Sequence, residues 1–226
     1  MVEELEWQAE VLGRLRPTGV RVAPPRRAQD GSIAVDGWTA WEYVAGRHEA
    51  RRWIDAIRAG DAFHAALAGE RRPAFLDRRT DPWSVGDRVA WGELPTADFA
   101  QVRHVKRLAA AMRPLQAPSQ LVHGDLGGNV LFADGLPPAV IDFSPYWRPV
   151  GFAAAIVVAD ALVWEGANAG ILSGVAGVPS FEQLFLRALV YRLVTGHVLG
   201  VEGLEGEGQD PYGPAVALAL RLAGGG

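Results

Sequence analysis

The spacing of apolar and polar positions predicts a helix near the start of the chain, followed by short strands. Residues 3–15 carry one face of helical spacing, formed by Leu5, Gln8, Leu12 and Leu15. Pro17 ends this predicted helix. Two strand-like runs, at 21–27 and 32–36, flank a Gln-Asp-Gly turn and predict a hairpin. An apolar and aromatic stretch at 38–44 follows it.

The rest of the chain is predicted to hold one long loop and several further elements. Residues 71–95, rich in Pro, Asp, Arg and Trp, are typical of an ordered loop. Apolar spacing and capping residues predict helices at 50–68, from Thr96 to Pro114, and at 151–166, 180–199 and 214–223. Short apolar runs predict strands at 121–122, 130–132 and 139–143. An acidic, glycine-rich connector is expected at 203–213.

This order, a little sheet followed mostly by helices, predicts an α+β fold with two unequal lobes. We place the boundary near residue 45. Residues 1–45 then hold the first helix, the hairpin and the apolar stretch after it, and residues 46–226 hold most of the helices.

Composition narrows the class of protein. The chain has 226 residues, of which 49% are hydrophobic and 21% charged, so it can bury a sizeable core. The formal net charge of −4 argues against a nucleic-acid surface, which needs clustered Lys and Arg. The absence of cysteine excludes disulfides and thiolate sites. Neither a signal peptide nor an apolar run of about 20 residues is present, so we expect a cytoplasmic protein without a membrane span.

The candidate chemistry lies in residues 121–143, which read LVHGDLGGNVLFADGLPPAVIDF. Asp125 and Asn129 are four residues apart in a glycine-rich loop, and Asp142 ends an apolar strand after a hairpin. The Asp142 carboxylate and the Asn129 amide oxygen form a hard, all-oxygen donor set suited to Mg²⁺. Asp125, beside that ion, can accept a proton from an incoming hydroxyl group. Phosphoryl transfer requires these parts, a metal on the phosphates and a base that orients the nucleophile.

This segment resembles the catalytic core of the aminoglycoside phosphotransferase family, the small-molecule branch of the protein-kinase-like fold. The family pattern His-Gly-Asp-Leu-x-x-x-Asn is similar to residues 123–129, with one intervening residue fewer, and the metal motif Ile-Asp-Phe/Trp is similar to residues 141–143. The resemblance implies that Asp125 is the catalytic base, that Asn129 and Asp142 bind Mg²⁺, and that ATP is the phosphate donor. It extends from about residue 3 over most of the chain, and further runs at 37–41, 75–80 and 144–149 resemble an actinobacterial subgroup of the family.

Two elements of the family's N-terminal lobe are missing from this sequence. No Gly-x-Gly-x-x-Gly occurs, and the single lysine, Lys106, lies in the helix before the catalytic loop. Residues 1–45 therefore resemble a truncated N-terminal lobe, which begins at the helix that follows both elements in the family. On that helix Gln8, and not a glutamate, shares the inward face. Either Met1 is an internal start or the lobe has been lost. The intact catalytic motifs favour the first explanation, and in both cases we expect weak or undetectable ATP turnover.

Several other residues allow a structural or a functional interpretation. In the kinase-like fold, the hinge contacts adenine through its backbone, and three consecutive residues stand at that position: Glu42, Tyr43 and Val44. A strand end packed into the core fits the pattern equally well. Tyr146 and Trp147 are the aromatic residues best placed to line a substrate pocket. Four histidines have no ligand-like spacing and are expected to be structural or surface residues and not metal ligands: His48, His64, His104 and His197. Asp160, on an apolar helix, is expected to be a capped or paired carboxylate.

Three functions fit these observations to different degrees. The first is a kinase-like phosphotransferase that moves the ATP γ-phosphate to a hydroxyl of a small molecule. The second is a non-catalytic, pseudokinase-like module that binds a nucleotide or a protein. A metal-dependent hydrolase ranks lower, because it needs more acidic or histidine ligands near Asp142. No nucleic-acid or membrane partner is expected, and self-association through the exposed edge of the small sheet is a further hypothesis.

Overall fold

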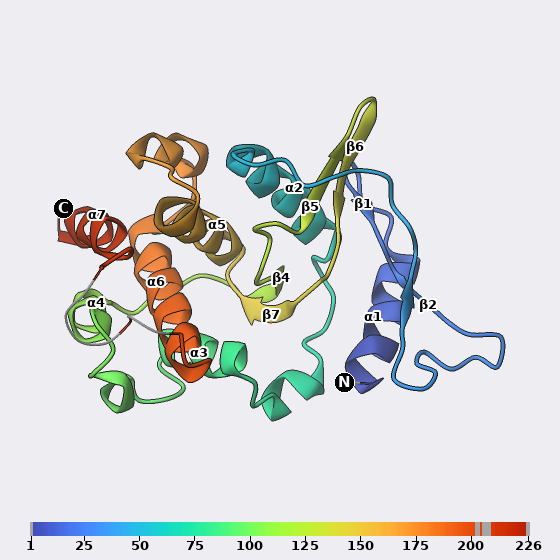
Figure 1. Cartoon of the computed structure of the whole chain (residues 1–226), viewed down its shortest axis with the longest axis horizontal. Coiled ribbons are helices and arrows are strands. Elements are labelled where there is room, and N and C mark those ends of the chain that lie inside the picture. The colour runs from blue at the N-terminus through green and yellow to red at the C-terminus, as the bar shows by residue number, and fades with distance from the viewer. Residues whose placement is uncertain (1, 202–203, 205–208, 225–226) are drawn as a thin grey trace. The chain divides into compact units, whose positions relative to one another are not determined.

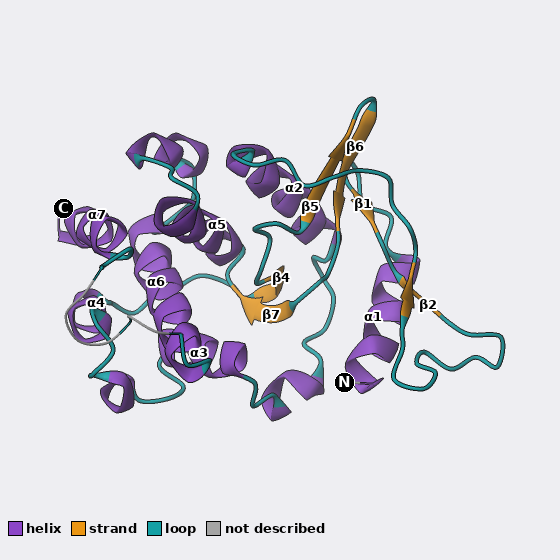
Figure 2. Ribbon diagram, viewed as in Figure 1, coloured by secondary structure: helices purple, strands orange, loops and turns teal. Residues whose placement is uncertain are grey.

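The computed structural model describes residues 2–201, 204 and 209–224, and it has an α+β fold (Figures 1 and 2). The α+β class expected from the sequence is confirmed. Contacts between residues divide the chain into two compact units. The first comprises Met1–Asp77 and Ser119–Val150, and the second comprises Arg78–Pro118 and Gly151–Gly226. This division does not fall at residue 45, and the lobe boundary placed there stays a prediction.

The first unit contains two helices and three small sheets. Its helices are α1 (Val2–Arg14) and α2 (Trp53–Ala66). Its strands are β1 (Arg21–Val22), β2 (Pro25–Arg26), β3 (Ala40–Trp41), β4 (Gln120–His123), β5 (Val130–Ala133), β6 (Leu136–Val140) and β7 (Pro145–Arg148). β6 lies between β1, its parallel neighbour, and β5, its antiparallel neighbour. Two antiparallel pairs, β2–β3 and β4–β7, complete the unit.

The predicted hairpin between 21–27 and 32–36 is wrong. The turn exists, because the backbone N–H of Ala28 donates to the carbonyl of Ser32 at 2.8 Å, but β2 pairs with β3 instead. Asp36 and Gly37 both have positive φ and reverse the chain a second time. That second reversal brings residues 40–41, and not residues 32–36, alongside β2. Self-association through the edge of this sheet stays a prediction that sedimentation can test.

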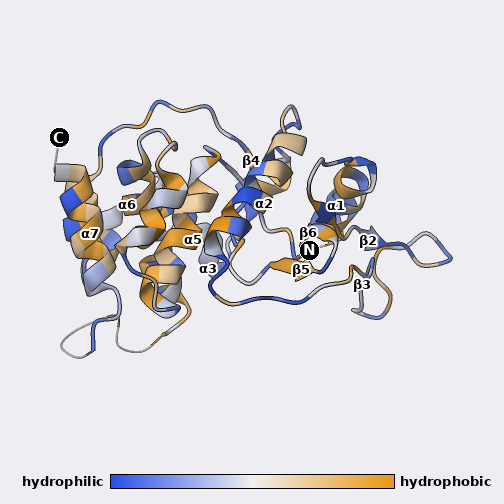
Figure 3. Cartoon of the chain, turned by 90° about the horizontal axis from the view of Figure 1, so that it is seen from above, coloured by the Kyte–Doolittle hydropathy of each residue, from blue (hydrophilic) through white to orange (hydrophobic). Residues whose placement is uncertain are grey.

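The second unit is helical. It contains α3 (Pro82–Ala90), α4 (Val105–Ala111), α5 (Gly151–Trp164), α6 (Phe181–Val198) and α7 (Gly213–Gly224), with 3₁₀ turns at Thr96–Phe99 and Ala169–Val175. A third 3₁₀ turn, Ala74–Arg78, spans the boundary between the two units. Helix α6 contacts all four other helices of this unit, and apolar residues dominate α5 and α6 (Figure 3). The three C-terminal helices are therefore confirmed. Five of the eleven residues of the connector predicted at 203–213, namely 203 and 205–208, lie outside the described residues.

Two predictions for this unit need correction. The stretch predicted as a loop at 71–95 contains α3, which begins with Asp81 as its N-cap and Pro82 in its first turn. Gly86 lets α3 approach α6 closely, since a Cβ there would lie 2.2 Å from Thr195 Oγ1. The single helix predicted from Thr96 to Pro114 is instead a 3₁₀ turn and a short helix, because His104 has a φ of 72° that breaks the helical path.

Within the part of the chain that the structure describes, every helix is too short or too polar to cross a bilayer.

Candidate active site

The three candidate catalytic residues all lie in the first unit, around the β5–β6 hairpin. Asp125 and Asn129 belong to the loop between β4 and β5, and Asp142 follows β6. The antiparallel register pairs Val130 with Val140, and the N–H of Ile141 donates to the Asn129 carbonyl at 3.0 Å. This pairing brings Asn129 beside the segment that carries Asp142.

Asn129 is oriented by Asp125. Its side-chain N–H₂ donates to the backbone carbonyl of Asp125 at 2.7 Å and lies 3.4 Å from the Asp125 carboxylate. The backbone N–H of Asn129 donates to the Leu126 carbonyl at 3.0 Å and closes the loop. Because the amide nitrogen faces Asp125, the Oδ1 atom of Asn129 is directed away from it and can serve as an oxygen ligand.

His123 joins the two catalytic segments. The N–H of Asp125 donates to His123 Nδ1 at 3.1 Å, and His123 Nε2 lies 3.0 Å from the carbonyl of Ile141. Since Nδ1 accepts and Nε2 faces an acceptor, the ring is neutral with its proton on Nε2. Burial lowers the pKa of His123, and this effect exceeds the opposing ones of its bond to Ile141 and of the Asp125 and Asp142 carboxylates. Both carboxylates therefore lie close enough to His123 to influence its charge.

Helix α2 supports this loop through His64 and Gly60, for which the sequence predicted no contact with the loop. His64 is 1% exposed, and its Nε2 accepts a hydrogen bond from the backbone N–H of His123 at 3.0 Å. Gly60 leaves space for Leu126, because a Cβ on Gly60 would lie 2.4 Å from Leu126 Cδ1. This position agrees with the expectation that His64 is a structural or surface residue, but its partner is 59 residues away in the chain. Apolar spacing within α2 alone cannot identify such a partner.

Helix α1 supports the Asp142 segment in a similar way. Gln8 is buried, and its side-chain N–H₂ donates to the Phe143 carbonyl at 3.0 Å. Two other acidic residues of α1 point elsewhere: Glu6 pairs with Arg27, and Glu10 lies 3.1 Å from Arg14. The predicted register of α1, with Gln8 facing inward, is therefore confirmed.

The geometry suits a cation that takes only part of its ligands from protein. Asp142 is exposed and has a φ of 48°, and Asn129 is half-buried. A carboxylate and an amide oxygen are hard donors of the kind Mg²⁺ prefers, and Mg²⁺ commonly takes its other ligands from phosphates and water. Among the described residues, no three His, Asp or Glu side chains are grouped as a metal site, so nothing here resembles an all-protein cage.

The hinge candidates are Glu42, Tyr43 and Val44, which follow β3. The N–H of Glu42 donates to the Pro24 carbonyl at 2.9 Å, so it is already used within the protein. The Tyr43 side chain is 87% exposed, which argues against the strand-end-in-core interpretation at that position. Contact with adenine through these residues stays a prediction.

The remaining sequence candidates have structural partners. Tyr146 is buried on β7, whereas Trp147 is half-buried. Asp160 accepts two hydrogen bonds from Arg192, at 2.8 and 2.5 Å, as expected of a paired carboxylate. His104 lies 2.8 Å from Asp210.

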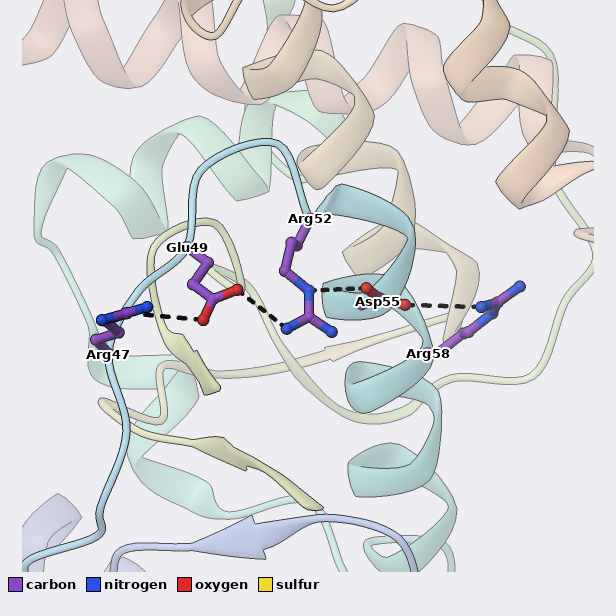
Figure 4. Close-up of polar contacts among 5 residues, drawn as sticks. All are labelled: Arg47, Glu49, Arg52, Asp55 and Arg58. Atoms are coloured by element: carbon purple, nitrogen blue, oxygen red, sulfur yellow. Dashed lines mark hydrogen bonds and ion pairs between the residues drawn. The ribbon is translucent and has the colours of Figure 1, made fainter. Parts of the chain in front are cut away.

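A second polar region of the first unit lies beside α2 and the β5–β6 hairpin (Figure 4). Arginine and carboxylate side chains alternate along it in the order Arg47, Glu49, Arg52, Asp55 and Arg58, and Arg52 also stacks on the Phe132 ring at 3.7 Å. Glu49, Arg52, Asp55 and Arg58 border a cavity of about 380 Å³. Each carboxylate lies between two arginines, and the stacking of Arg52 on Phe132 links this row of ion pairs to the β5–β6 hairpin.

Comparison with known proteins agrees with this geometry. The model of the phosphotransferase enzyme family (APH) matches residues 2–146, which include Asp125, Asn129 and Asp142. The chain therefore belongs to this family, whose members have a kinase-like fold. A search of curated proteins found no match.

Proposed function

We propose that this protein is a kinase-like phosphotransferase that moves the γ-phosphate of ATP to a hydroxyl group of a small molecule. The observation that carries the proposal is the orientation of Asn129. Its amide nitrogen is engaged by Asp125, so its oxygen is left for a cation next to the segment that carries Asp142. The match to the phosphotransferase family supports the same reaction class.

The roles of the residues follow from their positions. Asp125 is half-buried, and its backbone is fixed by His123 and Asn129, so its carboxylate can orient a hydroxyl group and accept its proton. Asn129 and Asp142 would hold Mg²⁺. When bound, this ion neutralises charge on the transferred phosphate. Glu42, Tyr43 and Val44 are the segment proposed to contact adenine.

A second candidate is a non-catalytic module that binds a nucleotide or a protein. The position of the single lysine favours it, because Lys106 lies on α4 in the second unit and not on a strand of the first. A strand lysine normally helps to hold the ATP phosphates in kinases. The intact set of Asp125, Asn129 and Asp142 favours the phosphotransferase.

One variant separates the two functions. With Mg·ATP as the probe, we expect slow phosphate release, below about 1 per second. Asp125→Asn should lower that rate by about 10²–10⁴-fold if Asp125 is the base. Asp134→Asn is the matched control, since this exposed carboxylate lies at the β5–β6 turn. A thermal shift with Mg·ATP that is the same in wild type and Asp125→Asn, together with no phosphate release from either, would favour the binding module.

A further inference from the structure

A hydrogen bond from α2 fixes the peptide that leads into the catalytic loop. His64 Nε2 accepts the backbone N–H of His123 at 3.0 Å, and both residues are almost completely buried. Because Nε2 is the acceptor, the ring proton of neutral His64 must lie on Nδ1. Among the described residues, His64 Nδ1 is a buried polar atom with no hydrogen-bond partner.

The buried Nδ1–H of His64, unpaired among the described residues, lowers the stability of the folded protein. A buried N–H group without an acceptor destabilises a protein, and an apolar side chain of similar volume would avoid that cost. Here the imidazole occupies a site next to the aromatic ring of Phe63, where such a side chain would be suitable. What the imidazole provides, and an apolar residue does not, is the acceptor for His123.

The acceptor acts on the catalytic residues through His123. With its N–H held by His64, His123 directs Nδ1 to the N–H of Asp125 and Nε2 to the carbonyl of Ile141, one residue before Asp142. Helix α2 also holds the strand before the loop, since Gln120 donates to the His64 carbonyl at 2.8 Å. The His64–His123, His123–Asp125 and His123–Ile141 bonds form a connected path from α2 to both carboxylate-bearing segments.

We propose that His64 is a positioning residue, which holds His123 and thereby fixes Asp125 relative to Asp142. This inference rests on the proposed function for its effect on activity. Its structural part, that the Nε2 acceptor sets the orientation and tautomer of His123, can be tested on its own.

The test compares an acceptor-retaining with an acceptor-free side chain. His64→Gln can place a carbonyl oxygen close to the Nε2 position, whereas His64→Leu fills the space without an acceptor. His48→Gln is the matched control, because His48 is exposed. Long-range ¹⁵N–¹H spectra of the imidazole rings report the tautomers directly, and His123→Gln assigns the His123 signals.

We expect His123 to have its proton on Nε2 in wild type, His48→Gln and His64→Gln, and to show a mixture of tautomers in His64→Leu. With Mg·ATP, His64→Leu should lower kcat about tenfold or more with little change in KM, while His64→Gln stays within about threefold of wild type, since misplaced groups reduce mainly the chemical step.

Equal ring spectra and equal kcat for His64→Leu and His64→Gln would overturn the proposal and leave His64 as a packing residue. If wild type releases no phosphate from Mg·ATP, the ring spectra alone decide the structural part, independently of the proposed function. If His64→Leu does not fold, His64→Met replaces it as a side chain with only a weak acceptor. A His123 tautomer in that variant identical to wild type would equally overturn the proposal.

Discussion

Gly124 lies directly against the ring of Tyr146. A Cβ built on Gly124 would stand 2.2 Å from Tyr146 Cδ2 and 2.3 Å from Cε2. The antiparallel pairing of β4 and β7 produces this approach, since it places Val122 opposite Tyr146 and lets the N–H of Gly124 donate to the Ser144 carbonyl at 2.9 Å. Only glycine fits at this position of the His-Gly-Asp motif, because the Tyr146 ring packs directly against the catalytic loop.

We therefore expect Gly124→Ala to destabilise the protein. Tyr146 is 5% exposed and its ring is rigid, so the added methyl group must displace the loop or the strand, at a cost of about 1–3 kcal/mol. Urea unfolding measures the change. Gly13→Ala in α1 is the control, because no atom lies within 4 Å of its Cβ position. That substitution should stabilise the helix by about 0.5–1 kcal/mol. An unchanged urea midpoint for Gly124→Ala would contradict the explanation.

The buried histidines predict a loss of stability in mild acid. Burial lowers the pKa of His64 from 6.5 to about 3 and also lowers that of His123. Below pH 6.5 the unfolded chain binds protons that the folded chain does not, so the unfolding free energy falls as the pH falls from 6.5 towards 3. The slope approaches about 1.4 kcal/mol per pH unit for each imidazole.

Urea unfolding at several pH values between 7.5 and 5 measures this dependence above the range where most carboxylates titrate. His64→Gln removes one imidazole and should reduce the slope of the unfolding free energy by up to about 1.4 kcal/mol per pH unit, the contribution of one proton. His48→Gln, at an exposed position, serves as the control. A slope that His64→Gln leaves unchanged would show that His64 takes up its proton without unfolding.

Local sequence patterns predicted the elements that have strong apolar periodicity. Helices α1, α2 and α5–α7 were predicted in this way. Helix α3 was missed because its composition of Pro, Asp and Arg is typical of a loop, although Asp81-Pro82 is a recognised start signal. The partner of β2 was predicted wrongly because a second reversal at Asp36-Gly37 decides it, and no local pattern in 21–36 contains that information.

The candidate site shows the same division between local and distant information. Asp125, Asn129 and Asp142 belong to one contiguous segment, and the hairpin between them makes their proximity predictable. The residues that hold them come from distant helices: His64 from α2 and Gln8 from α1. Apolar periodicity predicts that a histidine or glutamine on the inner face of a helix is buried. The neighbouring sequence does not specify which backbone group its side chain contacts.

Loss of the ion pair between Asp160 and Arg192 should strongly lower the free energy of unfolding. Both side chains are 14% exposed, and two hydrogen bonds join α5 to α6. Asp160→Ala leaves the mostly buried Arg192 without this partner, which should cost about 3 kcal/mol in urea unfolding. The control is Glu10→Gln, which breaks an exposed pair with Arg14 and should cost less than about 0.5 kcal/mol. Similar costs for both variants would contradict the role assigned to burial.

Asp142 combines an unfavourable backbone conformation with a proposed metal ligand, and this combination gives the last prediction. Its φ of 48° lies in the left-handed region that favours glycine. Asp142→Gly should therefore stabilise the fold by up to about 1 kcal/mol, whereas Asp142→Asn, which tolerates the same conformation, should change stability little. Both variants remove the carboxylate, so both should lose the Mg²⁺-dependent part of a thermal shift with ADP.

Asp36→Gly is the matched control, because Asp36 has a φ of 50° in an exposed turn and no proposed ligand role. It should gain stability in the same way as Asp142→Gly and keep the full Mg²⁺-dependent shift. If Asp142→Gly and Asp142→Asn both retained that shift, Asp142 would not be a metal ligand. If Asp142→Gly instead lowered stability while Asp36→Gly raised it, the Asp142 carboxylate would contribute to the fold itself, and its backbone strain would be offset by contacts within the first unit.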